Sequence, residues 1–358
     1  MTDQLFTPTK LGDIELKNRV VMAPLTRNRA PDSIPNDMMV DYYRQRASMG
    51  LIISEGTQVS LLGQGYAWTP GIWNDDQAKG WRKITDAVHQ EGGKIVAQLW
   101  HVGRISHPSL IEGADPIAPS AIASGAKTFD GEGFVETPTP RALAINEIPG
   151  IVDEFRKSAR IAIDAGFDGV EIHGANGYLI DQFLRDTSNT RTDDYGGSIE
   201  NRIRFAKEIV EAVTEEIGAG RTGIRISPFS NANNVGLDSD TEGLFGAFID
   251  VLNGFDLAYV HGIEGQTGGE RDHMEGMKRL IAKIKAPYMA NNGYDLELAE
   301  EAVEEGKGVA AVAFGRMAIA NPDLVERLKA GGPFNELNAD RLYGGGPDGY
   351  TDYPFLND

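Results

Sequence analysis

Three polar side chains that lie close together carry the clearest chemical signal in this sequence. His173, Asn176 and Tyr178 lie within six residues, directly after a short apolar run that ends at His173. An imidazole and an amide can each donate a hydrogen bond to one ligand oxygen, and a phenol can deliver a proton. The cluster predicts a site that polarises a carbonyl or nitro group and protonates the adjacent carbon. The alternative is a structural histidine followed by a helix-capping asparagine.

A second pair of polar residues lies within apolar runs, where side chains are expected to be buried. Gln98 presents both a donor and an acceptor, which suits the edge of a heterocycle such as the flavin pyrimidine. Arg225 needs an anionic partner if it is buried, and a reduced flavin would supply one. A structural ion pair with a carboxylate is the alternative for Arg225.

Glycines and a cation follow the last two apolar runs and point to a phosphate group. Asn292 and Gly293 end one of these runs, and Gly315 and Arg316 end the other. Glycine lets backbone N–H groups approach a ligand, and the arginine supplies a forked cation. Ordinary turn glycines beside a surface arginine would give the same pattern, but barrel proteins often bind phosphate after strands seven and eight.

Eight short apolar runs alternate with helical patterns and must position these side chains. The runs are 19–23, 51–59, 94–100, 168–173, 222–227, 257–261, 287–291 and 309–314. The helical patterns are 36–49, 75–91, 150–165, 199–217, 241–252, 273–285, 296–305 and 322–329. This alternation predicts parallel strands with crossover helices, and eight units favour a closed (β/α)8 barrel, or TIM barrel, over an open sheet. The active face of such a barrel is the carboxyl end of its strands.

Two segments extend this barrel. Residues 11–18 predict a hairpin that closes the barrel floor, and residues 101–149 form a long proline-containing excursion after the third strand. Loops of that length are usually functional, for example as lids. Since no internal repeat or linker is visible, residues 1–358 are expected to form a single domain.

Composition excludes several classes of protein. The 358 residues carry a net charge of −19, which argues against nucleic acid and anionic membrane surfaces as partners. The absence of cysteine excludes disulfides, thiolate metal sites and Cys-ligated iron–sulfur clusters, and the six histidines show no metal-ligand spacing. With no evident signal peptide and no apolar run of ~20 residues, we expect a cytoplasmic protein.

One glycine motif stands in the wrong context for a dinucleotide site. Residues 218–223 read Gly-Ala-Gly-Arg-Thr-Gly, but they follow a helix and open a strand. A dinucleotide site needs the order strand, turn, helix. We therefore expect a helix stop and turn here, and a nicotinamide that binds without a Rossmann unit.

Several segments together resemble the old yellow enzymes. They are 5–8 (LFTP), 18–20 (NRV), 23–26 (APLT), 98–104 (QLWHVGR), 173–179 (HGANGYL) and 191–202 (RTDDYGGSIENR). The resemblance runs from Leu5 to Pro354 and is strongest to bacterial reductases of nitrate esters and N-ethylmaleimide. Residues 127–139, 230–242 and 261–273 differ from the family's pattern.

The resemblance implies a role for each candidate residue. The implied ligands of tightly bound FMN are Pro24, Leu25, Thr26, Gly56, Gln98, His173, Arg225, Asn292, Gly293, Gly315 and Arg316. The implied substrate-binding residues are Tyr66, Trp100, His173, Asn176 and Tyr350. Thr26 would tune the flavin, and Tyr178 would be the proton donor. No metal is implied.

The activity implied by the resemblance is ene-reduction in two half-reactions at one site. NADPH or NADH would reduce FMN and leave, and a small electrophile would then take the hydride. Unsaturated carbonyls, maleimides and nitroalkenes are the implied acceptors, with nitrate esters and nitroaromatics also open. A dienoyl-CoA-type reductase is excluded because it needs iron–sulfur cysteines. A hydroxy-acid or dihydroorotate oxidase is not favoured by the 173–178 cluster, and a flavin- or phosphate-ligand-binding barrel without turnover remains the alternative.

Overall fold

Eight parallel strands close into a barrel in the computed structural model, which describes residues 3–358. The strands in ring order are β3 (Val20–Met22), β4 (Leu51–Gln58), β5 (Ile95–Trp100), β10 (Gly169–Gly174), β11 (Thr222–Ile226), β12 (Tyr259–Ile263), β13 (Tyr288–Asn291) and β14 (Val309–Phe314). Each strand falls on one of the eight predicted apolar runs, and the predicted (β/α)8 barrel is confirmed. Strands buried on both faces by a core and an outer helix layer read as continuous apolar runs.

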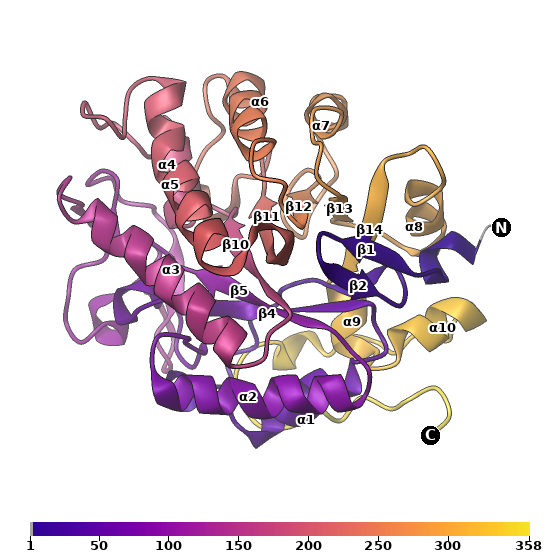
Figure 1. Cartoon of the computed structure of the whole chain (residues 1–358). Coiled ribbons are helices and arrows are strands. Elements are labelled where there is room, and N and C mark those ends of the chain that lie inside the picture. Colours follow the sequence, from indigo (N-terminus) through magenta and orange to yellow (C-terminus); the bar gives the residue numbers. More distant parts are fainter. Residues whose placement is uncertain (1–2) are drawn as a thin grey trace.

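Helices surround the strands on the outside (Figure 1). The longer ones are α1 (Asp37–Gln45), α2 (Asp75–Gln90), α3 (Ile148–Asp164), α5 (Ile199–Ile217), α6 (Thr241–Leu252), α7 (Met274–Ile281), α8 (Leu296–Ala302) and α10 (Leu324–Ala330). Two short helices, α4 (Leu179–Leu184) and α9 (Arg316–Ala320), were not predicted, because six and five residues are too few to show a helical period. Within residues 3–358, no helix is long and apolar enough to cross a membrane.

The predicted hairpin closes the amino end of the barrel. Strands β1 (Thr9–Leu11) and β2 (Ile14–Leu16) pair antiparallel, and Leu11, Ile14 and Leu16 are buried against residues of the barrel interior. Gly12 makes the turn with φ of 56°, and a Cβ there would lie 2.4 Å from the Gly220 carbonyl oxygen. Only glycine combines that backbone angle with so close an approach. The predicted turn at residues 218–223 is also confirmed, since α5 stops at Gly218, whose φ is 90°.

The excursion after β5 folds into two small sheets on the carboxyl side of the barrel. Strand β6 (Ile117–Ala118) pairs with β9 (Arg141–Ala142), and β7 (Lys127–Phe129) pairs with β8 (Phe134–Glu136) as a hairpin. The β7–β8 hairpin carries Phe129 and Phe134 to the mouth, and Phe134 is 68% exposed. This arrangement suits a lid over the carboxyl ends of the strands.

Two buried arginines fix the C-terminal segment across the same mouth. Arg27 donates to the carbonyl oxygens of Leu342 (2.9 Å) and Gly349 (2.6 Å), and Arg29 donates to that of Gly346 (3.1 Å). Charged donors make stronger hydrogen bonds than neutral ones. The segment is therefore tied to the loop after β3 at several points.

Tyr350, predicted at the mouth, lies elsewhere. Its ring is fully buried and stacks on Tyr42 with centroids 4.0 Å apart, and the guanidinium of Arg29 lies 4.4 Å from the ring centroid. The prediction is wrong because the segment turns inward at Tyr350. Tyr343, seven residues earlier, is 62% exposed and lines the cavity instead.

Glu55 lies fully buried in β4 beneath this segment. Its Oε2 accepts from the Arg27 backbone N–H at 3.3 Å, and its Oε1 accepts from the Tyr43 hydroxyl at 3.3 Å. Burial raises the pKa of Glu55 to about 7, against the lowering effect of Arg27 and Tyr43. The folded protein therefore binds this proton more tightly than the unfolded chain does. The stability that protonated Glu55 contributes to the folded state is complete below pH 4.5 and is lost as pH rises through 7.

Replacing Glu55 with Gln is expected to relieve this loss. Relative to the natural protein, the variant should gain roughly 3 kcal/mol of unfolding free energy between pH 4.5 and pH 8, because the amide never ionises. Denaturant unfolding of both proteins across that range measures the difference. The exposed Glu297→Gln serves as the control. A difference that stays constant with pH would contradict the assignment.

Candidate active site

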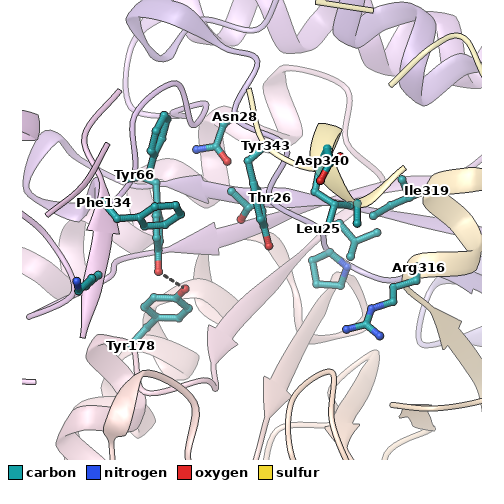
Figure 2. Close-up of a pocket in the computed structure, with 15 residues that line it drawn as sticks. Leu25, Thr26, Asn28, Tyr66, Phe134, Tyr178, Arg316, Ile319, Asp340 and Tyr343 are labelled. Carbon is teal, nitrogen blue, oxygen red and sulfur yellow. Dashed lines mark hydrogen bonds between the residues drawn. The ribbon is translucent and has the colours of Figure 1, made fainter. Parts of the chain in front are cut away.

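A cavity of about 690 Å³ opens at the carboxyl ends of the strands. Pro24, Leu25 and Thr26 line it just after β3, and Arg316 lies on the same side, whereas Tyr66 and Tyr178 line the opposite side (Figure 2). Phe134 and Tyr343 lie over it from the β7–β8 hairpin and the C-terminal segment. This volume is typical of a site for a cofactor or small ligand.

Trp100 is the centre of an aromatic cluster on the Tyr178 side. Its ring is nearly parallel to those of Tyr66 (centroids 5.7 Å apart) and His173 (6.2 Å), and Tyr178 meets it edge-on at 5.0 Å. A Cβ at Gly56 would lie 2.5 Å from Trp100 Cε3, so this glycine makes room for the indole. Edge-on and parallel-displaced contacts at these distances fix ring orientation.

The hydrogen bonds of His173 define which of its nitrogens carries the proton. The Ala175 backbone N–H donates to His173 Nδ1 at 3.3 Å, so Nδ1 is the acceptor and Nε2 carries the hydrogen. Burial lowers the pKa of His173 well below 6.5, and the nearby Arg225 charge lowers it further. His173 is therefore a neutral imidazole that offers one N–H donor.

A tight turn presents Asn176 beside His173. Asn176 has φ of 60°, and a Cβ on the following Gly177 would lie 2.5 Å from the Ala232 carbonyl oxygen. Asp181 Oδ2 accepts from the Gly177 N–H at 2.9 Å, and Asp181 itself pairs with buried Arg185 at 2.8 Å. Asp181 and Arg185 were not predicted, although their four-residue spacing is typical of an intrahelical ion pair.

Tyr178 is the phenol of this cluster. Its hydroxyl lies 3.1 Å from the Tyr66 hydroxyl, and its ring meets His173 edge-on at 5.0 Å. Burial raises the pKa of Tyr178 above 10. The phenol is therefore protonated across the physiological pH range and can serve as a proton donor.

A buried row of polar side chains connects strands β5, β10 and β12 of the barrel. Gln98 Nε2 donates to Glu171 Oε1 at 2.8 Å, and His261 Nδ1 lies 2.8 Å from Glu171 Oε2. Burial raises the pKa of Glu171, but the adjacent His261 and Arg225 outweigh it, so the pKa lies below 4.5. Glu171 is therefore an anion whose partners come from the adjacent strand β5 and from β12, which lies two strands away in the barrel.

Arg225 lies next to this row, paired in register with His173 on β10. It is 6% exposed, and it donates from Nη2 to Asn291 Oδ1 at 2.7 Å. Among residues 3–358, no acceptor lies within hydrogen-bond distance of its Nε and no carboxylate forms an ion pair with its guanidinium, since Glu171 pairs with His261 instead. The structure therefore does not contain the alternative, an ion pair between Arg225 and a carboxylate. Burial lowers the pKa of Arg225 to about 10, which leaves it charged at neutral pH.

The predicted phosphate residues lie at the ends of β13 and β14. Gly293 has φ of 68°, and a Cβ at Gly315 would meet only the Leu25 side chain, at 3.6 Å. Both backbones are therefore open to a ligand. Asn292 instead uses its side chain to donate to the carbonyl oxygens of Glu264 (2.8 Å) and Gln266 (2.9 Å), and so fixes the loop after β12.

Sequence reasoning missed a second cation on this side. Arg271 passes close to Gly293, since a Cβ there would lie 3.5 Å from Arg271 Cδ. Arg271 also pairs with Glu264 at 2.5 Å and lies 4.4 Å from the ring centroid of Tyr294. The sequence around Arg271 contains no motif that marks it as a site residue. It comes near Gly293 only because of how the loop after β12 folds.

These residues fit FMN. The partnerless Nε of buried Arg225 and the amide of Gln98 suit the polar edge of a flavin ring, and Gly293, Gly315 and Arg316 suit a phosphate. Pro24, Leu25 and Thr26 line the cavity together with Arg316. In the part of the chain that the structure describes, no group of three or more His, Asp or Glu is placed to hold a metal ion.

A barrel with such a cavity and an adjacent His–Tyr cluster defines a flavin-dependent oxidoreductase. The chain belongs to the NADH:flavin oxidoreductase / NADH oxidase family, which it matches over residues 4–335. This confirms the resemblance to old yellow enzymes, with FMN as cofactor and NAD(P)H as hydride donor.

Individual relatives match along almost the whole chain. Putative 12-oxophytodienoate reductase 5 of Oryza sativa subsp. japonica is 45% identical, over 99% of this chain and 96% of its own. 12-oxophytodienoate reductase 2 of Arabidopsis thaliana is 44% identical, over 98% and 96%. The solved structure of morphinone reductase superposes with a TM-score of 0.95 at 46% identity, covering 100% of this chain and 98% of its own. The old yellow enzyme homologue from Zymomonas mobilis gives 0.94 at 42%, covering 98% and 99%.

Proposed function

We propose that this protein is an ene-reductase in which His173 and Asn176 bind the oxygen of an electron-poor alkene and Tyr178 protonates its α-carbon. The observation that carries the proposal is the His173 tautomer. A neutral imidazole with hydrogen on Nε2 donates to an acceptor oxygen, and it lies edge-on to a protonated phenol. One donor and one acid side by side suit an activated alkene.

Each protein group has a distinct task in this reaction. When bound, FMN supplies the hydride chemistry that links NAD(P)H to the acceptor. Gln98 and Arg225 bind the polar edge of its ring, and Gly293, Gly315 and Arg316 bind its phosphate. His173 and Asn176 draw electron density toward the acceptor oxygen, and Tyr178 delivers a proton to the carbon beside the polarised group. Tyr66 and Trp100 shape the acceptor site.

The aromatic lining of the cavity favours small, largely apolar acceptors. Phe129, Phe134 and Tyr343 present aromatic surface above it. Relatives are named as reductases of 12-oxophytodienoate and morphinone. Unsaturated carbonyls, maleimides and nitroalkenes therefore form the proposed substrate class, with nitrate esters and nitroaromatics as further acceptors that have oxygens for the same two donors.

A visible spectrum of the purified protein, followed by anaerobic NADPH and then 2-cyclohexenone, tests the proposal. We expect a flavin band that bleaches with NADPH and returns with the enone. A band that bleaches but does not return would contradict enone reduction. Steady consumption of NADPH with the enone would exclude the alternative of a flavin- or phosphate-ligand-binding barrel without turnover, whereas a protein that remains colourless after incubation with FMN would overturn the flavin site.

The KM for a neutral enone is expected to be constant between pH 6 and pH 8. His173 is neutral throughout this range because burial lowers its pKa well below 6.5, and Tyr178 stays protonated because burial raises its pKa. Steady-state turnover measured at several enone concentrations and saturating NADPH gives the KM. An inflection near pH 6.5 would show that His173 titrates in the working range.

The amino-acid composition supports the rest of the proposal, which concerns the domain organisation, location and partners of the protein. The proposal includes a single domain over residues 1–358 and a cytoplasmic location, which a chain without cysteine suits. The net charge of −19 supports small molecules, and neither nucleic acid nor membrane, as partners.

A further inference from the structure

Asn176 is fixed at three of its hydrogen-bonding groups, which leaves one for a ligand. Its backbone N–H donates to Ser227 Oγ at 2.8 Å, and its backbone oxygen accepts from Asn233 Nδ2 at 2.8 Å. Its side-chain Oδ1 accepts from Thr267 Oγ1 at 2.7 Å. Within residues 3–358, the remaining Nδ2 group makes no hydrogen bond, so it is the donor left for an incoming oxygen.

A chain of hydroxyls sets the direction of the bond between Thr267 and Asn176. Buried Ser230 Oγ accepts from the backbone N–H groups of Thr267 (3.2 Å) and Ala232 (3.3 Å), and it lies 2.8 Å from Thr267 Oγ1. A hydroxyl has two acceptor positions and one hydrogen. Ser230 therefore donates to Thr267, and Thr267 donates its own hydrogen to Asn176. The carboxamide places Oδ1 toward Thr267, where it accepts this hydrogen.

The backbone around Thr267 is well fixed although its side chain is exposed. Gln266 donates from Nε2 to the Phe229 carbonyl oxygen and to Asp272 Oδ2, both at 2.9 Å. Gln266 Oε1 accepts from the Asn231 N–H at 3.0 Å, and the Gln266 carbonyl accepts from Asn292 at 2.9 Å. The Thr267 hydroxyl is therefore presented from a rigid position, as accurate orientation of a ligand-binding group requires.

We propose that Thr267 is a positioning residue that orients the Asn176 carboxamide so that Nδ2 faces the substrate oxygen. The proposal rests on the proposed function, in which Asn176 binds that oxygen. Without the Thr267 hydroxyl, the amide loses the hydrogen bond that favours this orientation, and the orientation that turns Oδ1 toward the substrate becomes populated. Two acceptor oxygens that face each other without a hydrogen repel.

Thr267 also lies within residues 261–273, one of the segments expected from the sequence to depart from the old yellow enzyme pattern. The contact joins residues 91 positions apart, from the loop after β12 to the turn after β10. The loop after β12 therefore supplies the group that orients the oxygen-binding amide.

A double-mutant cycle on the FMN-loaded protein tests the proposal. The four proteins are the natural chain, Thr267→Val, Asn176→Ala and the double variant, with Thr267→Ser as the conservative variant that keeps the hydroxyl. Calorimetric titration of the oxidised holoenzyme with 2-cyclohexenone, in the absence of NAD(P)H, measures binding without turnover. FMN affinity and thermal unfolding of each variant are recorded alongside.

Loss of one neutral hydrogen bond predicts that Thr267→Val weakens enone binding about 2- to 12-fold. The same substitution in the Asn176→Ala background should have no further effect, Thr267→Ser should bind within about 2-fold of the natural chain, and FMN affinity should be unchanged. A purely structural role would lower binding in both backgrounds alike. If Thr267→Val does not fold, Thr267→Ala takes its place in the cycle.

The outcomes separate the two proposals. If Asn176→Ala weakens enone binding but Thr267→Val does not, or if Thr267→Val acts equally in both backgrounds, the positioning role of Thr267 is overturned and the proposed function stands. If Asn176→Ala binds the enone as tightly as the natural chain, the oxygen-binding role of Asn176 is wrong, and the role of Thr267 fails with it.

Discussion

Replacing Tyr178 with Phe is expected to slow the acceptor half-reaction by about 10²- to 10⁴-fold, the usual contribution of a positioned general acid. The ring and its edge-on contacts with Trp100 and His173 remain, so only the acidic hydrogen is lost. Reduction by NAD(P)H needs no proton from this phenol and should proceed at the natural rate. Stopped-flow measurement of the two half-reactions separates them in one protein.

The matched control for this experiment is Tyr195→Phe. Tyr195 lies outside the cavity and donates from its hydroxyl to Glu208 Oε2 at 3.0 Å. This variant should leave both half-reactions unchanged, which shows that loss of a tyrosine hydroxyl is not harmful in general. Acceptor reduction at full rate in Tyr178→Phe would mean that the proton comes from another group or from solvent. Equal slowing of both half-reactions would instead indicate a disturbed flavin site.

The parts of the site carried on strands were predictable from sequence. His173 and Arg225 are register partners on the adjacent strands β10 and β11, and Gln98 pairs with Glu171 across β5 and β10. Once the apolar runs are recognised as neighbouring barrel strands, residues near their carboxyl ends must meet at one face. Strand order and register therefore convert a sequence pattern into a position in space.

The parts carried on loops were not predictable in the same way. Tyr343 rather than Tyr350 reaches the cavity because Arg27 and Arg29 bind backbone carbonyl oxygens of the C-terminal segment. Every residue has a carbonyl, so such contacts leave no mark in the sequence. The bond from Thr267 to Asn176 likewise depends on how the loop after β12 turns.

Replacing Arg225 with Met is expected to weaken FMN binding by about 10- to 150-fold, corresponding to the loss of a charged hydrogen-bonding partner. Methionine preserves length and apolar volume but removes the cation and its unsatisfied Nε donor. Fluorescence titration of the apoprotein with FMN measures the affinity directly. Arg225→Lys separates the two properties, because it keeps the charge but loses the planar fork, and an intermediate affinity is expected.

The thermal stability of the same apoproteins distinguishes a cofactor ligand from a structural arginine. Arg225 favours ionisation of buried Glu171, so Arg225→Met should raise the pKa of Glu171 and lower stability to some extent at neutral pH. Since no carboxylate among residues 3–358 forms an ion pair with the guanidinium, which donates to Asn291 instead, that loss should be smaller than the loss of FMN affinity. If Arg225→Met strongly destabilised the folded apoprotein but retained its FMN affinity, the assignment would be reversed, and Arg225 would be a structural residue of the barrel.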